Sequence, residues 1–430
     1  MKEPLEQTAK DNPLSRVTKK VNEVVTEVVS DIKKTVPALE PAIDFSSRIA
    51  SVVTAAVEEE LKREVPEILA SSKKFNTVVT EVGKHIPEVL IQQRRIATVI
   101  ASVGKHLPDR IVTSEEIEKK VGFEEKFNMP LGSIEKISGV RERRYVADNQ
   151  ASSDMAYEAS KIALERAGVE PDELDVIIFA SASHDIAEPA TANILQDKLK
   201  ATRAHVLDVK NACNSFLNGV DVMDSFMQTG RCRVGLVAAG EVLSKFVNWD
   251  IETIEELGLG FSAFTLGDGG GAIVFKAENE QGRGIRRTRF SSDGSAWELA
   301  TIKGGGTLHP FDITQLYFIS HSAGINKLAL RHIPSVMLGM MRETGWKHED
   351  VELVVPHQVT RGITERIMRI VNLPTEKAMY TVIKYGNTAA ASIPIALTEA
   401  IESNLVHPNS RIMLVGGASG FSAGVMTVVL

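Results

Sequence analysis

The sequence predicts a layered α/β protein that is preceded by an all-helical extension. Composition changes near residue 95: the segment before it contains almost no glycine, whereas glycine turns punctuate the remainder. In that remainder, apolar strand-like runs alternate with helical patterns, which favours sheets of substantially parallel strands covered by helices. The chain has 430 residues, 43% of them hydrophobic, which suffices for a large core and for two or three domains.

The predicted strands are short apolar runs, and the predicted helices show the three- and four-residue spacing of an amphipathic face. The strand runs are 97–103, 176–179, 204–209, 234–238, 272–275, 353–355 and 412–415. Helical patterns cover 153–167, 216–227 and 394–403.

The extension, residues 1–95, carries three amphipathic stripes. They span 17–36, 49–61 and 75–86, and each ends close to a proline, which cannot continue a helix. Residues 19–28 and 73–82 are identical at eight of ten positions, which indicates duplicated helical units. The apolar faces can pack on each other, on the rest of the chain or on a partner helix, or they can lie on a membrane surface. Balanced charges and few bulky aromatic residues weaken the membrane alternative.

Composition excludes several classes of function. A net charge of −7 without a polybasic stretch argues against a nucleic-acid partner. The two cysteines, Cys213 and Cys232, make a poor disulfide framework, and no regular spacing of metal ligands appears, so we expect no metal. Residues 1–20 lack the apolar core of a signal peptide, and no transmembrane-length apolar run follows. We expect a cytoplasmic protein, with a peripheral membrane location left open by residues 1–95.

Cys213 is the first candidate for chemistry. The apolar run 204–209 leads to it, and the helical pattern 216–227 follows, so it falls at a strand-to-helix junction. The start of a helix favours negative charge and lowers the pKa of a thiol, which makes a nucleophilic thiolate easier to form. The alternative is a buried structural cysteine, which is the commoner role.

Two later segments strengthen the catalytic interpretation. His357 follows the apolar run 353–355, and Asn387 lies in a glycine turn before the small-residue helix 394–403. A histidine at a strand end is usually structural, and a glycine–asparagine pair is usually a turn. A cysteine, a histidine and an asparagine that all lie at strand ends or turns together indicate a catalytic constellation.

These segments resemble the Cys–His–Asn triad of the thiolase superfamily, in its ketoacyl-ACP synthase III branch. The resemblance covers about residues 96–430 and leaves residues 1–95 outside. The matching motifs, in the family's order, are Gly104-Lys105-His106-Leu107-Pro108, Ser138-Gly139-Val140-Arg141-Glu142-Arg143, Asn211-Ala212-Cys213, Leu266-Gly267-Asp268-Gly269, Pro356-His357-Gln358, Gly386-Asn387 and Gly416-Gly417-Ala418-Ser419-Gly420.

The resemblance implies a duplicated thiolase fold of α/β/α/β/α layers, with halves at about 96–280 and 281–430. It also implies a homodimer built across an edge strand. In such enzymes the cysteine, here Cys213, takes the acyl group from acyl-CoA. Backbone N–H groups, here of Cys213 and of Ser419 in the Ser419–Gly420 loop, stabilise the oxyanion. Side-chain donors of His357 and Asn387 hold the enolate oxygen.

The carbanion for the second step has two possible sources. Glu188, in Ile186-Ala187-Glu188-Pro189, resembles the general base of the olefin-biosynthesis (OleA-type) thiolases, which reaches the partner subunit's site. The alternative is an ordinary glutamate before a helix-start proline. With Glu188 as the base, the resemblance implies non-decarboxylative Claisen condensation of two fatty acyl-CoA molecules to a β-keto acid. Acyl-CoA is then the substrate, and no cofactor is expected.

Two other functions remain open at this point. A synthase III-like enzyme would make the carbanion by decarboxylating malonyl thioester on acyl carrier protein or CoA. A thiolase-like scaffold or lipid-surface protein would be inactive, which the intact triad argues against. Asn214 and Ser215 depart from the apolar or small residues usual after the nucleophile, so acyl chain length stays open. Arg361 and Arg366 can meet a CoA or carrier phosphate, or belong to a solvated helix face.

Overall fold

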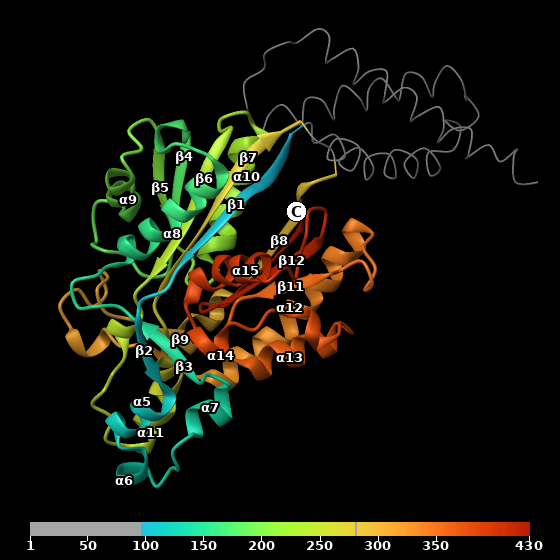
Figure 1. The fold of residues 1–430 in the computed structure, drawn as a ribbon. Coiled ribbons are helices and arrows are strands. Elements are labelled where there is room, and N and C mark those ends of the chain that lie inside the picture. The colour runs from blue at the N-terminus through green and yellow to red at the C-terminus, as the bar shows by residue number, and fades with distance from the viewer. Residues whose placement is uncertain (1–95, 280–281) are drawn as a thin grey trace, which may run out of the picture. The chain divides into compact units, whose positions relative to one another are not determined.

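The computed structural model describes residues 96–279 and 282–430, and residues 95–430 form one compact unit (Figure 1). The three stripes and the repeat predicted in residues 1–95 lie outside the described residues. The predicted boundary between the two halves falls at residues 280 and 281, which are also outside them, so it stays a prediction. Among the helices described, none is long and apolar enough to cross a bilayer.

The first sheet has five strands, in the order β1-β7-β6-β4-β5. They are β1 (Ala97–His106), β7 (Gly269–Glu278), β6 (Val234–Glu241), β4 (Val176–Ala180) and β5 (His205–Val209). β4 pairs with β5 and β6 in parallel, whereas β7 pairs with β1 and β6 antiparallel. β5 is therefore an edge strand of this sheet, and its one neighbour is the parallel strand β4.

The second sheet has four strands, in the order β11-β12-β13-β8. They are β11 (Leu353–Pro356), β12 (Arg411–Ala418), β13 (Ser422–Val429) and β8 (Gly284–Ser292). Only the β11–β12 pair is parallel. The predicted strands are thus confirmed, but the prediction of substantially parallel sheets is only partly right. The reason is local: β12 and β13 are joined by a turn of three residues, which can connect only antiparallel neighbours.

Helices cover the outer faces of both sheets (Figure 1). α8 (Ser152–Ala167) packs on β1, β6 and β7, and α9 (Thr191–Leu199) packs on β4 and β5. On the second sheet, α12 (Ser322–Thr344) packs on β8 and β13, and α13 (Arg361–Ile370) packs on α12.

Two helices lie between the sheets and form the central layer. α10 (Ser215–Gln228) contacts β4, β6 and β13, and α15 (Ser392–Glu402) contacts β1, β7 and β11. Their apolar side chains merge into one buried cluster with both sheets. Gly219 permits this approach, because a Cβ there would lie 2.7 Å from Cβ of Ala180 on β4. The result is the α/β/α/β/α layering that the resemblance implies.

Shorter elements cap one end of the layers. They are β2 (Arg110–Thr113), β3 (Glu142–Tyr145), β9 (Ala300–Thr301), β10 (Ile319–Ser320), α5 (Ser114–Val121), α6 (Phe123–Phe127), α7 (Ser133–Ser138), α11 (Ile254–Gly260) and α14 (Val382–Tyr385).

Candidate active site

Cys213 lies between β5 and α10, at the strand-to-helix junction that the sequence predicts. The residue before it, Ala212, has φ 47°, in the left-handed region that residues other than glycine rarely adopt. The Ser215 hydroxyl secures this turn: it accepts the N–H of Asn211 at 2.7 Å and donates to the carbonyl of Ala212 at 2.6 Å. Strained backbone beside a reactive side chain is typical of functional sites.

The surroundings of Cys213 hold its thiol in the protonated form. Burial raises the pKa of the thiol to about 12, and the carboxyl of Glu241 adds to the rise, while the backbone N–H of Cys213 opposes it. The sequence predicted a lowered pKa, from the start of the following helix. Burial and a nearby negative charge act in the opposite direction and outweigh it. The thiol therefore needs a proton acceptor before it can attack.

His357 is positioned through one nitrogen of its ring. Nδ1 lies 2.7 Å from Oγ of Ser392, and the same Oγ lies 2.7 Å from the carbonyl oxygen of Ala389. The carbonyl has no proton to give, so the hydroxyl proton of Ser392 must point to it. Nδ1 of His357 is then the donor toward Oγ, and Nε2 of the neutral ring carries the lone pair.

Burial keeps the His357 ring neutral at ordinary pH. It lowers the pKa of the ring to about 4, although the bond to the Ala389 carbonyl opposes this. The backbone N–H of His357 donates to the carbonyl of Val415 at 2.7 Å, which fixes the residue at the end of the parallel β11–β12 pair.

Asn387 is held by hydrogen bonds to its amide oxygen and to its backbone. Its Oδ1 accepts the N–H of Ala389 at 3.0 Å, which leaves Nδ2 as the free end. Its backbone N–H donates to Thr265 at 2.8 Å, and its carbonyl accepts from Gly267 at 3.0 Å. Gly386, at φ 64°, is required before it, because a Cβ there would lie 2.5 Å from the Thr265 carbonyl oxygen.

The turn at Ala389–Ala390 is where these residues converge. The side chain of Ala389 belongs to an apolar cluster against which Cys213 packs. The carbonyl oxygen of Ala389 accepts hydrogen bonds from the Ser392 hydroxyl and from the His357 ring. The N–H of Ala389 donates to Oδ1 of Asn387. The structure thus brings His357 and Asn387 to one turn, and Cys213 packs against the same apolar cluster as Ala389 of that turn. Their joint action in catalysis stays a prediction.

The Ser419–Gly420 loop lies beside the nucleophile segment. It is the turn between β12 and β13, and Gly420 has φ 84°. Ser422, directly after it, accepts from Nδ2 of Asn214 at 3.0 Å and of Asn211 at 3.3 Å. The unusual Asn214 therefore joins the nucleophile turn to Ser422 at the end of this loop. A backbone donor of Ser419 near Cys213 stays a prediction.

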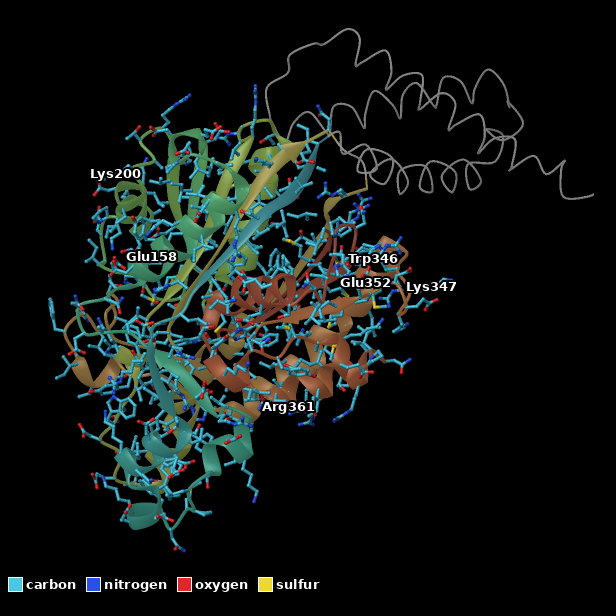
Figure 2. The ribbon with its side chains drawn as sticks, in the orientation of Figure 1. Glu158, Lys200, Trp346, Lys347, Glu352 and Arg361 are labelled. Atoms are coloured by element: carbon cyan, nitrogen blue, oxygen red, sulfur yellow. The ribbon has the colours of Figure 1, made fainter. Side chains whose placement is uncertain are left out.

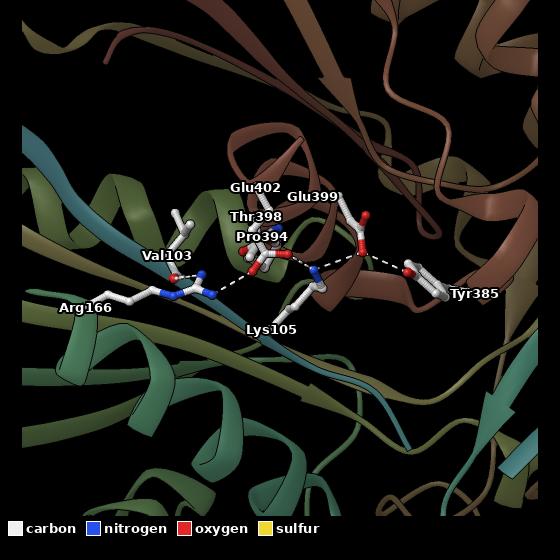
Figure 3. A network of polar contacts seen from close by, with 8 residues as sticks. All are labelled: Val103, Lys105, Arg166, Tyr385, Pro394, Thr398, Glu399 and Glu402. Atoms are coloured by element: carbon white, nitrogen blue, oxygen red, sulfur yellow. Dashed lines mark hydrogen bonds and ion pairs between the residues drawn. The ribbon is translucent and has the colours of Figure 1, made fainter. Parts of the chain in front are cut away.

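A polar network joins β1 and α8 to the central helix α15 and to Tyr385 on α14 (Figure 3). Lys105 of β1 pairs with Glu399 at 3.0 Å and with Glu402, both on α15. Arg166 of α8 pairs with Glu402 at 2.7 Å, and the Tyr385 hydroxyl donates to Glu399 at 2.7 Å. Tyr385 lies two residues before Asn387, so this network anchors the turn that carries the amide.

Glu188 lies on a different loop from these residues. Its side chain is exposed, on the loop between β4 and α9. The loop is fixed to the edge strand β5, since the N–H groups of Thr191 and Ala192 both donate to the Asp208 carboxylate at 2.8 Å. In the described part of the chain, no hydrogen bond or ion pair connects Glu188 with Cys213.

Arg361 and Arg366 lie on the outer helix α13, and Figure 2 shows Arg361 at the surface. Arg361 pairs with Glu365 at 2.7 Å, which raises the pKa of the guanidinium, and it stacks over the Tyr380 ring at 5.8 Å. Arg366 is exposed. A contact of either side chain with a CoA or carrier phosphate stays a prediction.

The sequence reasoning missed three residues of the site. Gln358 accepts from the N–H groups of Thr381 and Val382 at 3.1 Å each, and so holds the segment that leads to Asn387. Ser392 sets the proton position on the histidine ring. Glu241 is the last residue of the buried apolar strand β6. An acidic residue at the end of an apolar run is the one feature of the sequence that could have indicated a role for Glu241.

We expect the stability that neutral His357 contributes to be lost as pH falls. Between pH 6.5, the ordinary pKa, and about 4, the unfolded chain binds a proton and the folded chain does not. At roughly 1.4 kcal/mol per pKa unit, the loss reaches about 3 kcal/mol. Denaturant unfolding of the wild type and a His357→Asn variant between pH 8 and 4 measures it. Equal losses in the two proteins would contradict the prediction.

Two family models match the chain. Residues 207–294 match the model of 3-oxoacyl-[acyl-carrier-protein] synthase III, and residues 341–430 match that of its C-terminal part. Among curated proteins, the beta-ketoacyl-[acyl-carrier-protein] synthase III of Listeria monocytogenes is 34% identical over 291 residues, which is 68% of this chain and 87% of the relative. The protein of the same name from Natranaerobius thermophilus is 34% identical over 73% of this chain and 93% of its own length.

Solved structures show the same architecture. The 3-oxoacyl-[acyl-carrier-protein] synthase III of Aquifex aeolicus has a TM-score of 0.68 at 31% identity, over 77% of this chain and 100% of that one. A variant of Xanthomonas campestris OleA has a TM-score of 0.71 at 23% identity, over 78% of this chain and 99% of its own. At that identity the second match speaks for the fold alone.

Proposed function

Because the chain belongs to the 3-oxoacyl-[acyl-carrier-protein] synthase III family, and is thus a condensing acyltransferase of the thiolase superfamily, we propose that it joins two fatty acyl-CoA molecules by non-decarboxylative Claisen condensation. The observation that carries the finer assignment is Glu188: an exposed carboxylate on a loop fixed to edge strand β5, within a motif that resembles that of a general base.

In the first half-reaction, Nε2 of His357 takes the proton of the Cys213 thiol. The thiolate attacks the acyl-CoA carbonyl, and the backbone N–H groups of Cys213 and Ser419 stabilise the oxyanion. Collapse of this intermediate forms the acyl-cysteine and releases CoA as a thiolate, which takes a proton from solvent. Nε2 now bears a hydrogen, so the same atom becomes a donor.

In the second half-reaction, a second acyl-CoA gives up an α-proton to Glu188. Nδ2 of Asn387 and the protonated Nε2 of His357 donate to the enolate oxygen. The enolate carbon attacks the acyl-cysteine carbonyl and expels the Cys213 thiolate, which recovers its proton from His357. Glu188 releases the α-proton to solvent, which balances the proton taken up by the CoA thiolate. The product is a β-ketoacyl-CoA, and hydrolysis of its thioester by water gives the β-keto acid. No resident cofactor takes part, since acyl-CoA supplies both carbon units.

The proposal includes a homodimer that pairs subunits across β5. An edge strand offers unpaired N–H and C=O groups to a second copy. Glu188 lies outside that edge, on the loop whose end is tied to Asp208. Pairing there carries Glu188 toward the site of the partner subunit, where it acts as the base.

Incubation of the purified protein with a fatty acyl-CoA as the only thioester tests the proposal. We expect sustained release of CoA, a β-keto acid in the mass spectrum and an acyl adduct on Cys213. CoA release that requires malonyl thioester would refute the non-decarboxylative step. Absence of any acyl adduct on Cys213 would favour the inactive scaffold instead.

Decarboxylative condensation is the second candidate, because the Listeria monocytogenes and Natranaerobius thermophilus relatives at 34% identity are both named beta-ketoacyl-[acyl-carrier-protein] synthase III. In that case the second substrate is a malonyl thioester on acyl carrier protein or CoA. Loss of CO2 generates the carbanion, so no general base is needed. Malonyl dependence and an unchanged rate in a Glu188 variant are its signatures.

A further inference from the structure

We infer that Glu241 is a positioning residue of the condensation site: its carboxylate binds the loop that starts at Ala182 and the turn that contains Ala390, and so holds segments of both halves against the end of β6. The inference rests on the proposed role of Cys213 as the nucleophile. It applies to either source of the carbanion.

The Glu241 carboxylate receives four hydrogen bonds from two segments. Oε1 accepts from the N–H of Ala182 at 2.7 Å and of Ala390 at 3.2 Å. Oε2 accepts from the N–H of Ser183 at 3.0 Å and from its hydroxyl at 2.7 Å. One oxygen thus bridges the first-half loop that leads to Glu188 and the turn that holds His357 and Asn387.

Only an acceptor with two equivalent oxygens satisfies this arrangement, since every partner in it is a donor. The Ser183 hydroxyl accepts from the N–H of Val242 at 3.1 Å and lies 2.9 Å from Oγ of Ser152, so its own proton is directed at Glu241. A glutamine would place its NH₂ group against N–H donors on one side or the other. An aspartate is one methylene shorter and cannot reach both segments.

The surroundings of Glu241 make its ionised form energetically unfavourable. Glu241 is fully buried, and the four donors that bind it are all uncharged. Burial raises its pKa to about 7, although the four hydrogen bonds oppose the rise. A buried carboxylate without a cation is expensive, and such groups are concentrated at functional sites.

The charge of Glu241 also acts on the nucleophile. It is the second cause, after burial, of the raised pKa of the Cys213 thiol. In the resting protein it therefore favours the protonated thiol. A residue that served only to hold the fold together would leave thiol reactivity unchanged.

Glu118 provides a matched control. It is also fully buried, and its carboxylate accepts the N–H groups of Gly132 and Ile134 at 2.6 Å each. It lies on α5, and neither of its partners belongs to the segments that carry Cys213, His357 or Asn387. Glu118→Gln therefore reproduces the loss of a buried carboxylate that binds backbone donors, without the link to the reacting groups.

The test compares Glu241→Gln with Glu118→Gln in the full chain. We expect kcat of condensation to fall about 10- to 100-fold in Glu241→Gln with little change in KM, as for other residues that orient a reacting group. We also expect iodoacetamide to alkylate Cys213 faster, with the rate rising at lower pH than in the wild type. Peptide mass spectrometry follows Cys213, with the buried Cys232 as an internal reference.

A second variant separates reach from charge. Glu241→Asp keeps the charge, so Cys213 should stay as slow to alkylate as in the wild type, while kcat falls because the shorter side chain cannot span both segments. This variant decides the question if Glu241→Gln does not fold. Wild-type kcat in Glu241→Asp, or a kcat and an alkylation profile in Glu241→Gln that match those of Glu118→Gln, overturns the inference. If the wild type does not condense acyl-CoA at all, but Cys213 of Glu241→Gln is alkylated faster as expected, the proposed function is refuted. The role of Glu241 at Cys213 then still stands.

Discussion

A Glu188→Gln protein is expected to accept an acyl group on Cys213 at the wild-type rate and to form β-keto acid about 10²- to 10⁴-fold more slowly. A general base contributes roughly that factor to proton abstraction, and the amide cannot take the α-proton. Glu188 is exposed on its loop, so the substitution should not disturb the fold. Release of one CoA per subunit in a rapid first phase, followed by almost no further release, is the measurable result.

Glu349→Gln is the matched control for this experiment. The Glu349 side chain is 73% exposed, and it lies on the loop between α12 and β11. It should release CoA and β-keto acid at the wild-type rate. A Glu188→Gln protein that condenses acyl-CoA at full speed removes Glu188 from the mechanism. Mixing this variant with Cys213→Ala adds a test of the dimer: activity should return, because each mixed dimer holds one complete site.

His357→Ala is expected to slow acylation of Cys213 by about 10²- to 10⁴-fold, which is the usual worth of a general base. The reason is the raised pKa of the thiol, about 12, which leaves almost no thiolate near neutral pH. Without Nε2 as an acceptor, only this small fraction can attack. The rate of adduct formation on Cys213, followed by intact-protein mass spectrometry, measures the effect.

The same experiment contains its own check. The rate in His357→Ala should rise steeply with pH toward 10, because hydroxide then supplies the thiolate that the histidine no longer generates. His407→Ala, an exposed histidine in the loop before β12, should behave as the wild type. Acylation that is equally fast in His357→Ala and the wild type would show that another group takes the thiol proton.

Much of the fold follows from local pattern in the sequence. The runs 97–103, 176–179 and 234–238 become β1, β4 and β6, because short runs of apolar residues gain most from burial within a sheet. Strand direction does not follow in the same way. It depends on which strands become neighbours, and β12 and β13 pair antiparallel only because a short turn happens to join them.

The candidate site shows the same division. Cys213, His357 and Asn387 were identified from motifs, since each motif sets a strand end or a turn by local backbone rules. The roles of their atoms were not. The lone pair on Nε2 depends on Ser392, and the orientation of the Asn387 amide depends on the N–H of Ala389. Both are hydrogen bonds that exist only once the turn is folded.

By itself, the sequence determined seven of the strands and the helices α8, α10 and α15, the family resemblance and the three residues that its motifs single out. These are properties of short segments, and short segments are specified by their own residues. The tertiary structure decided the direction of the strands, the protonated state of the Cys213 thiol and the place of Glu241 beside it. The sequence predicted a lowered pKa for the Cys213 thiol, whereas in the structure the pKa is raised. The causes are burial and the charge of a side chain on another strand, which act through space and are not encoded by any local pattern.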